Sequence, residues 1–407
     1  MIKRKVILIT AVILSNTLFA QPPGGRGNIN MTLPDGDGKE LIEAICYSCH
    51  TVFNIVGSAG YDSSEQWQNI FGTMVNLPAR QAGTIGDYLA EHFPADPSRA
   101  PTLVPGDFEI DIIEWQVPTL GQRSRDPVEA PDGSIWWTGM WASLIGRLDP
   151  KTGDMEEYRL PLAARPHSII PDANGNIWYS GNSNSTIGML DPETGLITEY
   201  RTQARDPHTM TWHPNGNLYF TSQNASMLGR LDPETGKIDE IETEQRPYGI
   251  KVARNGTVFI AYNGTNKIGA MDPETMEVRY FTISEPQSRI RRLDLASDDS
   301  IWYVNSTMGR IGHLDPRTGA YQEWNSPSGP ESHPYALSVI DDVVWYNESG
   351  MRPDTLVRFE PESETFQSWG IPSGVGIVRN SWATRDGNLL IHQSSTNKVG
   401  LVIIPKD

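Results

Sequence analysis

The sequence predicts a mainly β protein, a seven-bladed β-propeller preceded by a small all-α domain. Two observations carry this prediction. A phrase of the type Ile-Gly-Arg-Leu-Asp-Pro-Lys-Thr-Gly returns at intervals of 40–45 residues through the C-terminal part of the chain. Ahead of it, residues 38–94 show the apolar spacing of short helices.

The repeat has seven copies, and its Leu-Asp-Pro step or the equivalent residues start at Leu148, Leu190, Leu231, Met271, Leu314, Phe359 and Ile403. A period near 40–45 residues with several short strands per unit is typical of a propeller with one blade per repeat. In the second unit the expected strands are HSIIPD, NIWYS, TIGMLD and LITEYRT, from the channel outward. Asn-Gly and Pro-Glu-Thr-Gly are the expected turns.

The last repeat ends without an outer strand, whereas residues 108–118, FEIDIIEWQVP, read as an outer strand without a blade. We expect this strand to complete the seventh blade, because closure leaves no sheet edge open. The expected organisation is a signal peptide at 1–20, a haem domain at 30–94, a proline-rich linker at 95–106 and the propeller at 107–407.

Charge and the N-terminus limit the expected partners and location. The formal net charge of -17 argues against a nucleic-acid partner. Lys3, Arg4 and Lys5 precede an apolar run and small Ala20, which is the order found in secretory signal peptides. We expect a periplasmic or secreted protein with no membrane span after cleavage; an uncleaved N-terminal anchor is the alternative.

Cys46, Cys49 and His50 predict one covalently attached haem c. Two thiols spaced Cys-x-x-Cys add to the porphyrin vinyl groups, and the adjacent imidazole becomes the proximal iron ligand. A zinc site would need two further ligands, and a thioredoxin-like pair would need a strand before it and a helix after it. Met74 is the expected distal iron ligand, His92 is its competitor, and a purely core role for Met74 is the remaining alternative.

Residues 38–94, with KELIEAICYSCH at the motif and DYLAEHFP near the end, resemble small class I c-type cytochrome domains. This resemblance implies an all-α, cytochrome c-like domain that transfers electrons to or from a redox partner protein.

Aligning the repeats on their aromatic second strands places one polar-tipped residue at the mouth of each inner strand. These residues are Arg125, His167, His208, Tyr248, Arg291, Tyr335 and Arg379. Three guanidinium groups on one axis predict a cradle for a small, anionic, oxygen-rich substrate; a solvated channel rim is the alternative. Glu348, on the same face, is a candidate metal ligand or general base, or else a surface carboxylate.

The units RPHSIIPDANGNIWYS and DPHTMTWHPNGNLYFTS resemble those of the streptogramin lyase (virginiamycin B lyase) family over residues 107–404. The resemblance implies a magnesium-dependent carbon–oxygen lyase that opens a cyclic lactone by elimination. It also implies that His167 and His208 act as acid or base, with Asp206 as the acidic neighbour. The following strand, YFTSQN, departs from the family pattern because it contains no acid.

Three functions follow from these observations. The first is an exported redox protein with a small-molecule substrate at the propeller mouth. The second is a lyase with an accessory haem domain. The third is a non-catalytic propeller that docks a redox partner through its acidic surface.

Overall fold

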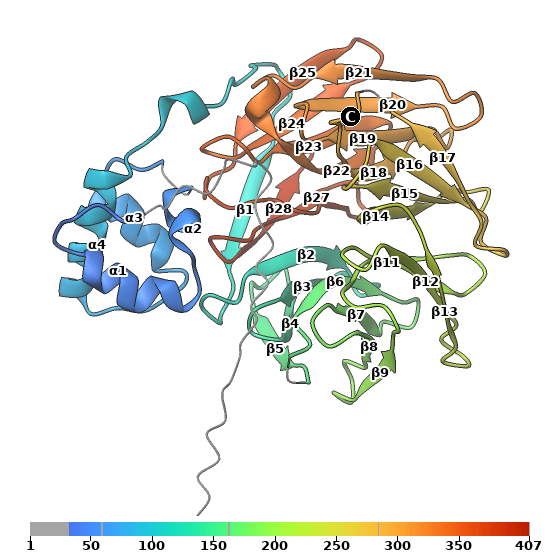
Figure 1. Cartoon of the computed structure of the whole chain (residues 1–407), viewed down its shortest axis with the longest axis horizontal. Coiled ribbons are helices and arrows are strands. Elements are labelled where there is room, and N and C mark those ends of the chain that lie inside the picture. Colours follow the sequence, from blue (N-terminus) through green and yellow to red (C-terminus); the bar gives the residue numbers. More distant parts are fainter. Residues whose placement is uncertain (1–31, 58–59, 162, 284, 407) are drawn as a thin grey trace, which may run out of the picture. The chain divides into compact units, whose positions relative to one another are not determined.

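The computed structural model describes residues 32–57, 60–161, 163–283 and 285–406. In these ranges seven four-stranded antiparallel sheets follow one another around a ring (Figure 1). The innermost strand of each sheet contacts that of the next sheet. The predicted seven-bladed propeller is therefore confirmed, while the predicted signal peptide at 1–20 lies outside the described residues.

The blades keep one strand order, from the channel outward. Blades one to three contain β2 (Ser124–Glu129), β3 (Ile135–Gly139), β4 (Leu144–Leu148) and β5 (Met155–Arg159); β6 (Pro166–Pro171), β7 (Ile177–Gly181), β8 (Thr186–Leu190) and β9 (Ile197–Arg201); β10 (Pro207–Trp212), β11 (Leu218–Ser222), β12 (Met227–Leu231) and β13 (Ile238–Glu242). Blades four to six contain β14 (Pro247–Val252), β15 (Val258–Tyr262), β16 (Lys267–Met271) and β17 (Val278–Thr282); β18 (Ile290–Leu295), β19 (Ile301–Asn305), β20 (Arg310–Leu314) and β21 (Tyr321–Asn325); β22 (Pro334–Ile340), β23 (Val343–Glu348), β24 (Thr355–Glu360) and β25 (Thr365–Gly370).

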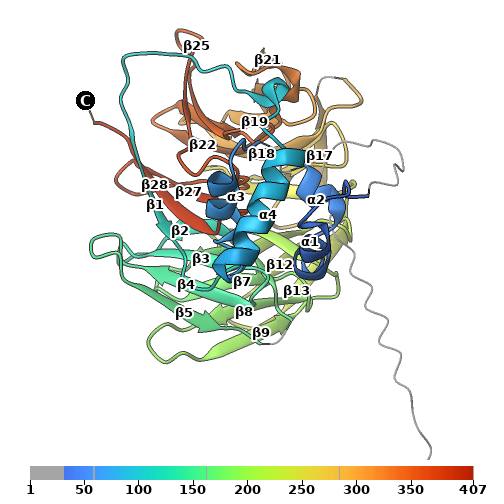
Figure 2. The same cartoon turned by 90° about the vertical axis from the view of Figure 1, so that its left-hand side faces the viewer.

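The seventh blade joins the two ends of the propeller. It contains β26 (Trp382–Ala383), β27 (Leu389–Gln393), β28 (Lys398–Ile403) and, outermost, β1 (Asp111–Gln116). β1 pairs antiparallel with β28 from Asp111↔Ile403 to Gln116↔Lys398, and the two strands lie side by side in Figures 1 and 2. The predicted closure by the N-terminal strand is confirmed.

The repeated phrase makes the turn between the third and outer strands. Asp191 caps this turn in blade two, where its Oδ1 accepts hydrogen bonds from the backbone N–H groups of Glu193 and Thr194 at 2.9 and 3.3 Å. Gly195 follows at φ +71, a conformation that favours glycine. Local chemistry of the Asp-Pro-x-Thr-Gly sequence therefore sets the turn, which is why the repeat was readable.

The glycine in the third strand has a packing role. In blade three an added Cβ on Gly229 would lie 2.0 Å from Cζ of Phe220, a fully buried side chain of β11. The same arrangement pairs Gly146 with Trp137, Gly188 with Tyr179 and Gly312 with Tyr303. The aromatic ring of the second strand therefore lies directly against a bare backbone in the third.

The N-terminal helices are α1 (Lys39–Ile45), α2 (Val52–Val56), α3 (Ser64–Phe71) and α4 (Ala79–His92), with 3-10 turns at Cys46–Ser48 and Pro97–Arg99. They lie together as one group, which we call the helical segment (Figure 2). Its core contains Ile42, Trp67, Ile85 and Tyr88. The prediction of helices ahead of the propeller is confirmed, and residues 32–407 form one compact unit that includes both. No helix in the described part of the chain is long and apolar enough to cross a membrane.

The proline-rich stretch 95–106 runs along the propeller. Val104 donates its backbone N–H to Ser368 Oγ at 2.9 Å, and Arg99 donates from Nε to the Gly350 carbonyl at 3.1 Å. The predicted linker is thus attached to blade six along its length.

Candidate functional site

The channel-facing residues lie at β-bulges. A register shift occurs in all six full-length inner strands, at the residue predicted to face the channel. The strands are β2, β6, β10, β14, β18 and β22, and the residues are Arg125, His167, His208, Tyr248, Arg291 and Tyr335. In β6 the pairs Pro166↔Gly181 and Ile169↔Tyr179 leave His167 and Ser168 opposite one residue. A bulge turns side chains away from the regular alternation of a strand. The bulges therefore direct these side chains at the channel.

Hydroxyl groups of the second strands fix the bulges and connect neighbouring blades. Ser180 Oγ accepts from the bulge N–H of Ser168 at 2.9 Å and donates to the His208 carbonyl of the next blade at 2.8 Å. Thr221 does the same with Thr209 N–H at 3.2 Å and the Tyr248 carbonyl at 3.0 Å. The backbone carbonyls of His208 and Tyr248 are thus each held by a hydroxyl of the preceding blade.

We call the seven residues Arg125, His167, His208, Tyr248, Arg291, Tyr335 and Arg379 the channel ring. Six of them are buried and Arg379 is half-buried. The ring centroids of His167 and His208 are 3.5 Å apart, and those of His208 and Tyr248 are 4.2 Å apart. The hydroxyls of Tyr248 and Tyr335 are 2.5 Å apart, and Arg379 donates from Nη1 to the Tyr335 hydroxyl at 3.2 Å. The structure thus brings these predicted residues together.

Asp126, Arg292 and His392 also lie at the channel ring. The sequence pattern did not predict these three residues. Oδ2 of Asp126 lies 3.9 Å from both His167 Nδ1 and Arg292 Nη2. Arg292 donates from Nε to the Arg379 carbonyl at 3.1 Å. His392, on β27, accepts from the Arg379 backbone N–H at 3.2 Å.

Burial and the arginines keep the histidines of this site neutral. Burial lowers the pKa of His167 well below its ordinary value, and Arg125 lowers it further. The pKa values of His208 and His392 are lowered well below the ordinary value for the same two reasons, burial and nearby arginines. Burial raises the pKa of Asp126, opposed by Arg292 and Arg125. The site therefore offers neutral imidazoles inside a cationic wall.

Many polar atoms of the site have no hydrogen-bond partner among the described residues. They are Nε of Arg125, Arg291 and Arg379, Nη2 of Arg292, Nδ1 of His167 and His392, Nε2 of His208, and both carboxylate oxygens of Asp126. Buried guanidinium groups are costly unless an anion or acceptor pairs with them. The geometry therefore fits an anion that accepts several hydrogen bonds at once.

Asp206 and Glu348 lie in different hydrogen-bond networks from the ring. Asp206 accepts from the backbone N–H groups of Asn224 and Ala225 at 2.7 and 3.2 Å, and burial raises its pKa to about 6. Glu348 accepts from Ser326 Oγ, Ser328 Oγ and Thr355 Oγ1 at 2.6, 2.6 and 2.7 Å. Both carboxylates hold loops in place.

The donors at the ring do not fit a magnesium ion. Mg²⁺ requires oxygen ligands, usually one or two carboxylates. Asp126 is the carboxylate among the ring residues and their three neighbours, and Arg125, Arg292 and Arg379 would compete with a metal ion for it. Over the described ranges no group of three or more His, Cys, Asp or Glu side chains could hold a metal ion.

The Cys-x-x-Cys-His sequence forms a tight turn. Both cysteines are free thiols, Cys46 half-buried and Cys49 exposed. The backbone N–H groups of Cys49 and His50 donate to the Cys46 carbonyl at 3.1 and 2.9 Å. Burial raises the pKa of Cys46 to about 11. Burial and the Arg123 guanidinium lower the pKa of His50, which leaves a neutral imidazole that can bind a metal.

His50 and the loop that contains Met74 contact neighbouring residues of the propeller, which are Trp141, Arg123, Gly121 and Asn397. The His50 ring lies 5.8 Å from that of Trp141, and the Arg123 guanidinium lies 5.0 Å over Trp141. The carbonyl of Thr73, next to Met74, accepts from the backbone N–H of Gly121 at 3.1 Å and from Asn397 Nδ2 at 2.9 Å. Asn397 Oδ1 in turn accepts from the Arg123 backbone N–H at 2.7 Å.

His92 lies elsewhere in the helical segment. Its ring packs 4.4 Å from that of Tyr88, and its Nε2 lies next to Gly36. His92, the alternative distal ligand, therefore lies beside Gly36 and Tyr88, and its contacts there include neither Arg123 nor Trp141.

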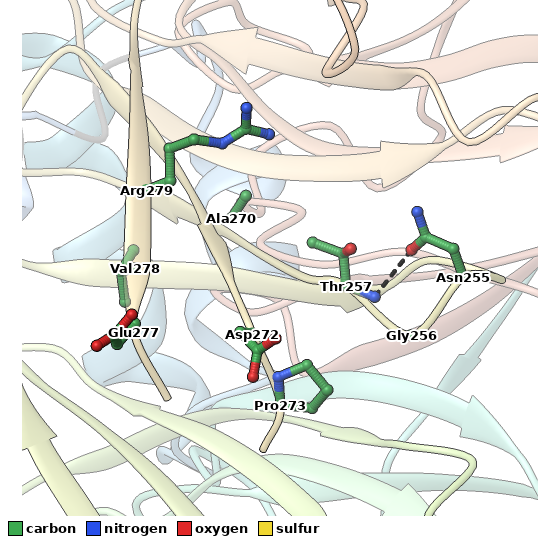
Figure 3. Close-up of a pocket in the computed structure, with 9 residues that line it drawn as sticks. All are labelled: Asn255, Gly256, Thr257, Ala270, Asp272, Pro273, Glu277, Val278 and Arg279. Carbon is green, nitrogen blue, oxygen red and sulfur yellow. Dashed lines mark hydrogen bonds between the residues drawn. The ribbon is translucent and has the colours of Figure 1, made fainter. Parts of the chain in front are cut away.

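One surface pocket lies away from all these residues. It is at the outer part of blade four, where Asn255, Asp272, Glu277 and Arg279 are among the lining side chains (Figure 3). Asn255 Oδ1 accepts from the Thr257 backbone N–H at 2.9 Å, so its polar groups serve the local turn. None of the channel-facing residues predicted from the sequence lines this pocket.

The fold and the channel ring define a seven-bladed propeller with a polar central site, preceded in the chain by the helical segment. The chain belongs to the virginiamycin B lyase family, whose model matches residues 108–243 and 234–405. Virginiamycin B lyase from Staphylococcus aureus is similar in structure, with a TM-score of 0.66 and 22% identity over 73% of this chain and 100% of that one.

Two further solved structures are similar at low identity. A catalytically inactive variant of the S. aureus enzyme with quinupristin has a TM-score of 0.65 and 23% identity over 73% of this chain and 100% of that one. Kuenenia stuttgartiensis hydrazine synthase has a TM-score of 0.59 and 12% identity over 70% and 96%. No protein in the curated set matches the chain. At these identities the structural likeness concerns the fold alone.

Proposed function

We propose that the chain is an exported c-type haem protein whose propeller binds and transforms a small, anionic, oxygen-rich substrate at the channel ring. Covalent haem would be held by Cys46 and Cys49, with His50 and Met74 as iron ligands. When bound, the haem would supply one-electron transfer to or from a redox partner protein. Export rests on the N-terminal sequence.

A single residue, Arg123, carries this proposal. Its guanidinium lies over Trp141, the ring beside His50. Burial lowers the pKa values of His50, His167 and His392, and the positive charge of Arg123 adds to the lowering in each case. Arg123 is therefore within electrostatic reach of both the haem motif and the ring, and this shared neighbour supports a single redox function for the two parts.

The residues of the helical segment fit a haem group. Two thiols not joined to each other and a neutral imidazole are available on one turn. Through Thr73, the loop that contains Met74 contacts propeller residues that neighbour those beside His50, which favours Met74 over His92 as distal ligand.

The full chain is to be purified from a host that attaches c-type haem. We expect covalent haem in the wild type and complete loss of it in the Cys46→Ala, Cys49→Ala variant, measured by haem staining after denaturing electrophoresis. Met74→Leu should lose the near-infrared band of methionine-ligated ferric haem, and His92→Leu should keep it. Haem that stays attached without both cysteines would refute the cofactor, and the reverse result at Met74 and His92 would exchange the distal ligand.

Arg123→Met should lower the midpoint potential of the haem, because a neighbouring cation stabilises the electron-rich reduced state. Arg246→Met is the matched control: both arginines directly precede an inner strand at positive φ, +56 and +59, but Arg246 precedes β14. Redox titration of both variants checks this. Equal midpoint potentials in the wild type and Arg123→Met would show that Arg123 does not act on the haem, and would remove the support for a shared redox function.

A lyase function is the second candidate, favoured by the family and by the closely spaced neutral pair His167 and His208. A neutral imidazole can accept a proton next to an ester carbonyl. Opening of a cyclic depsipeptide lactone that is lost in His167→Ala and His208→Ala, and unchanged in the Cys46→Ala, Cys49→Ala variant, would establish this function over the redox one.

A further inference from the structure

The two tyrosines of the channel ring form a pair unlike the other members. Their hydroxyls are 2.5 Å apart, at the short end of the range for an O–H to O hydrogen bond, and both side chains are buried. The Tyr335 oxygen also accepts from Arg379 Nη1 at 3.2 Å. The Tyr335 oxygen therefore contacts both the Tyr248 hydroxyl and the Arg379 guanidinium.

Arginines surround this pair on several sides. The Arg291 guanidinium lies 4.2 Å over the Tyr335 ring, and that of Arg379 lies 5.5 Å from it. Arg292 lies 4.8 Å over the Tyr248 ring. The other titratable groups that act on the site are Arg123, Arg125, Asp126, His167, His208 and His392. Asp126 is the acid among them, so positive charge exceeds negative charge around the pair.

The two hydroxyls consequently differ in acidity. Burial opposes ionisation of Tyr335, but Arg291, Arg379 and Arg125 outweigh it and lower the pKa of Tyr335 well below its ordinary value. Burial and the charge of Tyr335 raise the pKa of Tyr248. Tyr248 is then the phenol that donates, and Tyr335 the oxygen that accepts.

We propose that Tyr335 is a phenolate that compensates the arginines of the empty ring and takes up one proton when a dianionic oxyanion binds there. This inference rests on the proposed anion site. A bound dianion supplies the negative charge that the arginines require, so the phenolate is no longer favoured and its oxygen is protonated. Binding of the anion and protonation of Tyr335 are therefore linked.

The same linkage gives Tyr335 a catalytic role when the substrate itself carries an ionisable O–H group. The substrate O–H bond breaks, a new O–H bond forms on Tyr335, and the electron pair stays on the substrate oxygen. The resulting substrate anion is stabilised by Arg291 and Arg379. The substrate class is thus a hydroxylated oxyanion that becomes a dianion at the site.

Sulfate is a suitable probe because it is a dianion that does not titrate near neutral pH. Calorimetric titration of the holoprotein with sulfate, at one pH in two buffers of different ionisation enthalpy, measures the protons taken up. We expect uptake of about one proton per sulfate by the wild type and none by Tyr335→Phe. The Kd for sulfate should rise about tenfold per pH unit above the pKa of free Tyr335, and stay flat in Tyr335→Phe.

Two variants keep the test decisive. Tyr248→Phe removes one donor from the Tyr335 oxygen, so the pH at which sulfate affinity begins to fall should move upward. Tyr303→Phe removes a buried tyrosine hydroxyl that donates to Glu323 at 3.2 Å in blade five, and should leave proton uptake unchanged. Sulfate binding without proton uptake in the wild type would overturn the phenolate while leaving the anion site intact. Absence of sulfate binding would overturn the anion site itself.

Discussion

We expect Gly229→Ala to lower the free energy of unfolding by about 3 kcal/mol, at the upper end of the usual cost of overpacking a core. The added Cβ would lie 2.0 Å from Cζ of Phe220, and Phe220 is fully buried between sheets, so its ring has no free space to enter. Gly229 lies in an extended strand without positive φ, so alanine meets no backbone strain there. The cost comes from packing alone, and urea denaturation measures it.

Gly83→Ala is the matched control for this substitution. An added Cβ there meets nothing within 4 Å, and Gly83 lies inside α4. Alanine in a helix interior is favoured over glycine by about 1 kcal/mol, so this variant should be slightly more stable than the wild type. In the double variant Gly229→Ala, Phe220→Val, the smaller side chain should recover part of the loss. Full stability of Gly229→Ala alone would show that the ring and glycine do not constrain each other.

The fold could be predicted because its determinants are local. Asp191 and Gly195 set a turn within five residues, and the same residue types return in three other repeats, as Asp149 and Gly153, Asp232 and Gly236, and Asp315 and Gly319. The closing strand was also readable, because residues 108–118 had the pattern of an outer strand and the last repeat lacked one. The helical segment followed from spacing, whereas a haem-bearing role for it remains a proposal.

The channel ring could be predicted only in part, because a sequence alignment assigns one inward side chain to each strand. Bulges break that rule. In β18 the register shifts between Ile290 and Leu293, so Arg292 reaches the site together with Arg291. In β2 the shift between Arg125 and Val128 does the same for Asp126. His392 comes from a second strand, β27, beside the two-residue inner strand β26. Adjacent polar pairs such as Arg291 and Arg292 were the available signal.

Asp354→Asn should strongly change the way in which the free energy of unfolding depends on pH. Asp354 is fully buried, Arg352 donates to its Oδ1 at 3.0 Å, and its Oδ2 has no partner among the described residues. Burial raises the pKa of this carboxyl to about 8, against an ordinary 3.8, although Arg352 and Arg99 oppose the shift. The folded protein therefore binds a proton here that the unfolded chain releases above about pH 4.

The sign of the effect follows from that difference. The stabilisation from the protonated carboxyl is complete below pH 4 and is lost as the pH rises through about 8. Asparagine does not titrate, so the free energy of unfolding of Asp354→Asn minus that of the wild type should increase by about 1.4 kcal/mol per pH unit. Over this range the total is roughly 5 kcal/mol.

Urea denaturation of both proteins at pH 5, 7 and 9 isolates this contribution, because every other titrating group is common to them. Asp107→Asn, which makes the same chemical change at an exposed carboxyl, is measured alongside as the control. A constant difference between the wild type and Asp354→Asn at all three pH values would mean that Asp354 is ionised in the folded protein at each of them, as it is in the unfolded chain. In that case Arg352 and Arg99 would balance the cost of burying its charge, and the contact between residues 95–106 and blade six would not depend on pH.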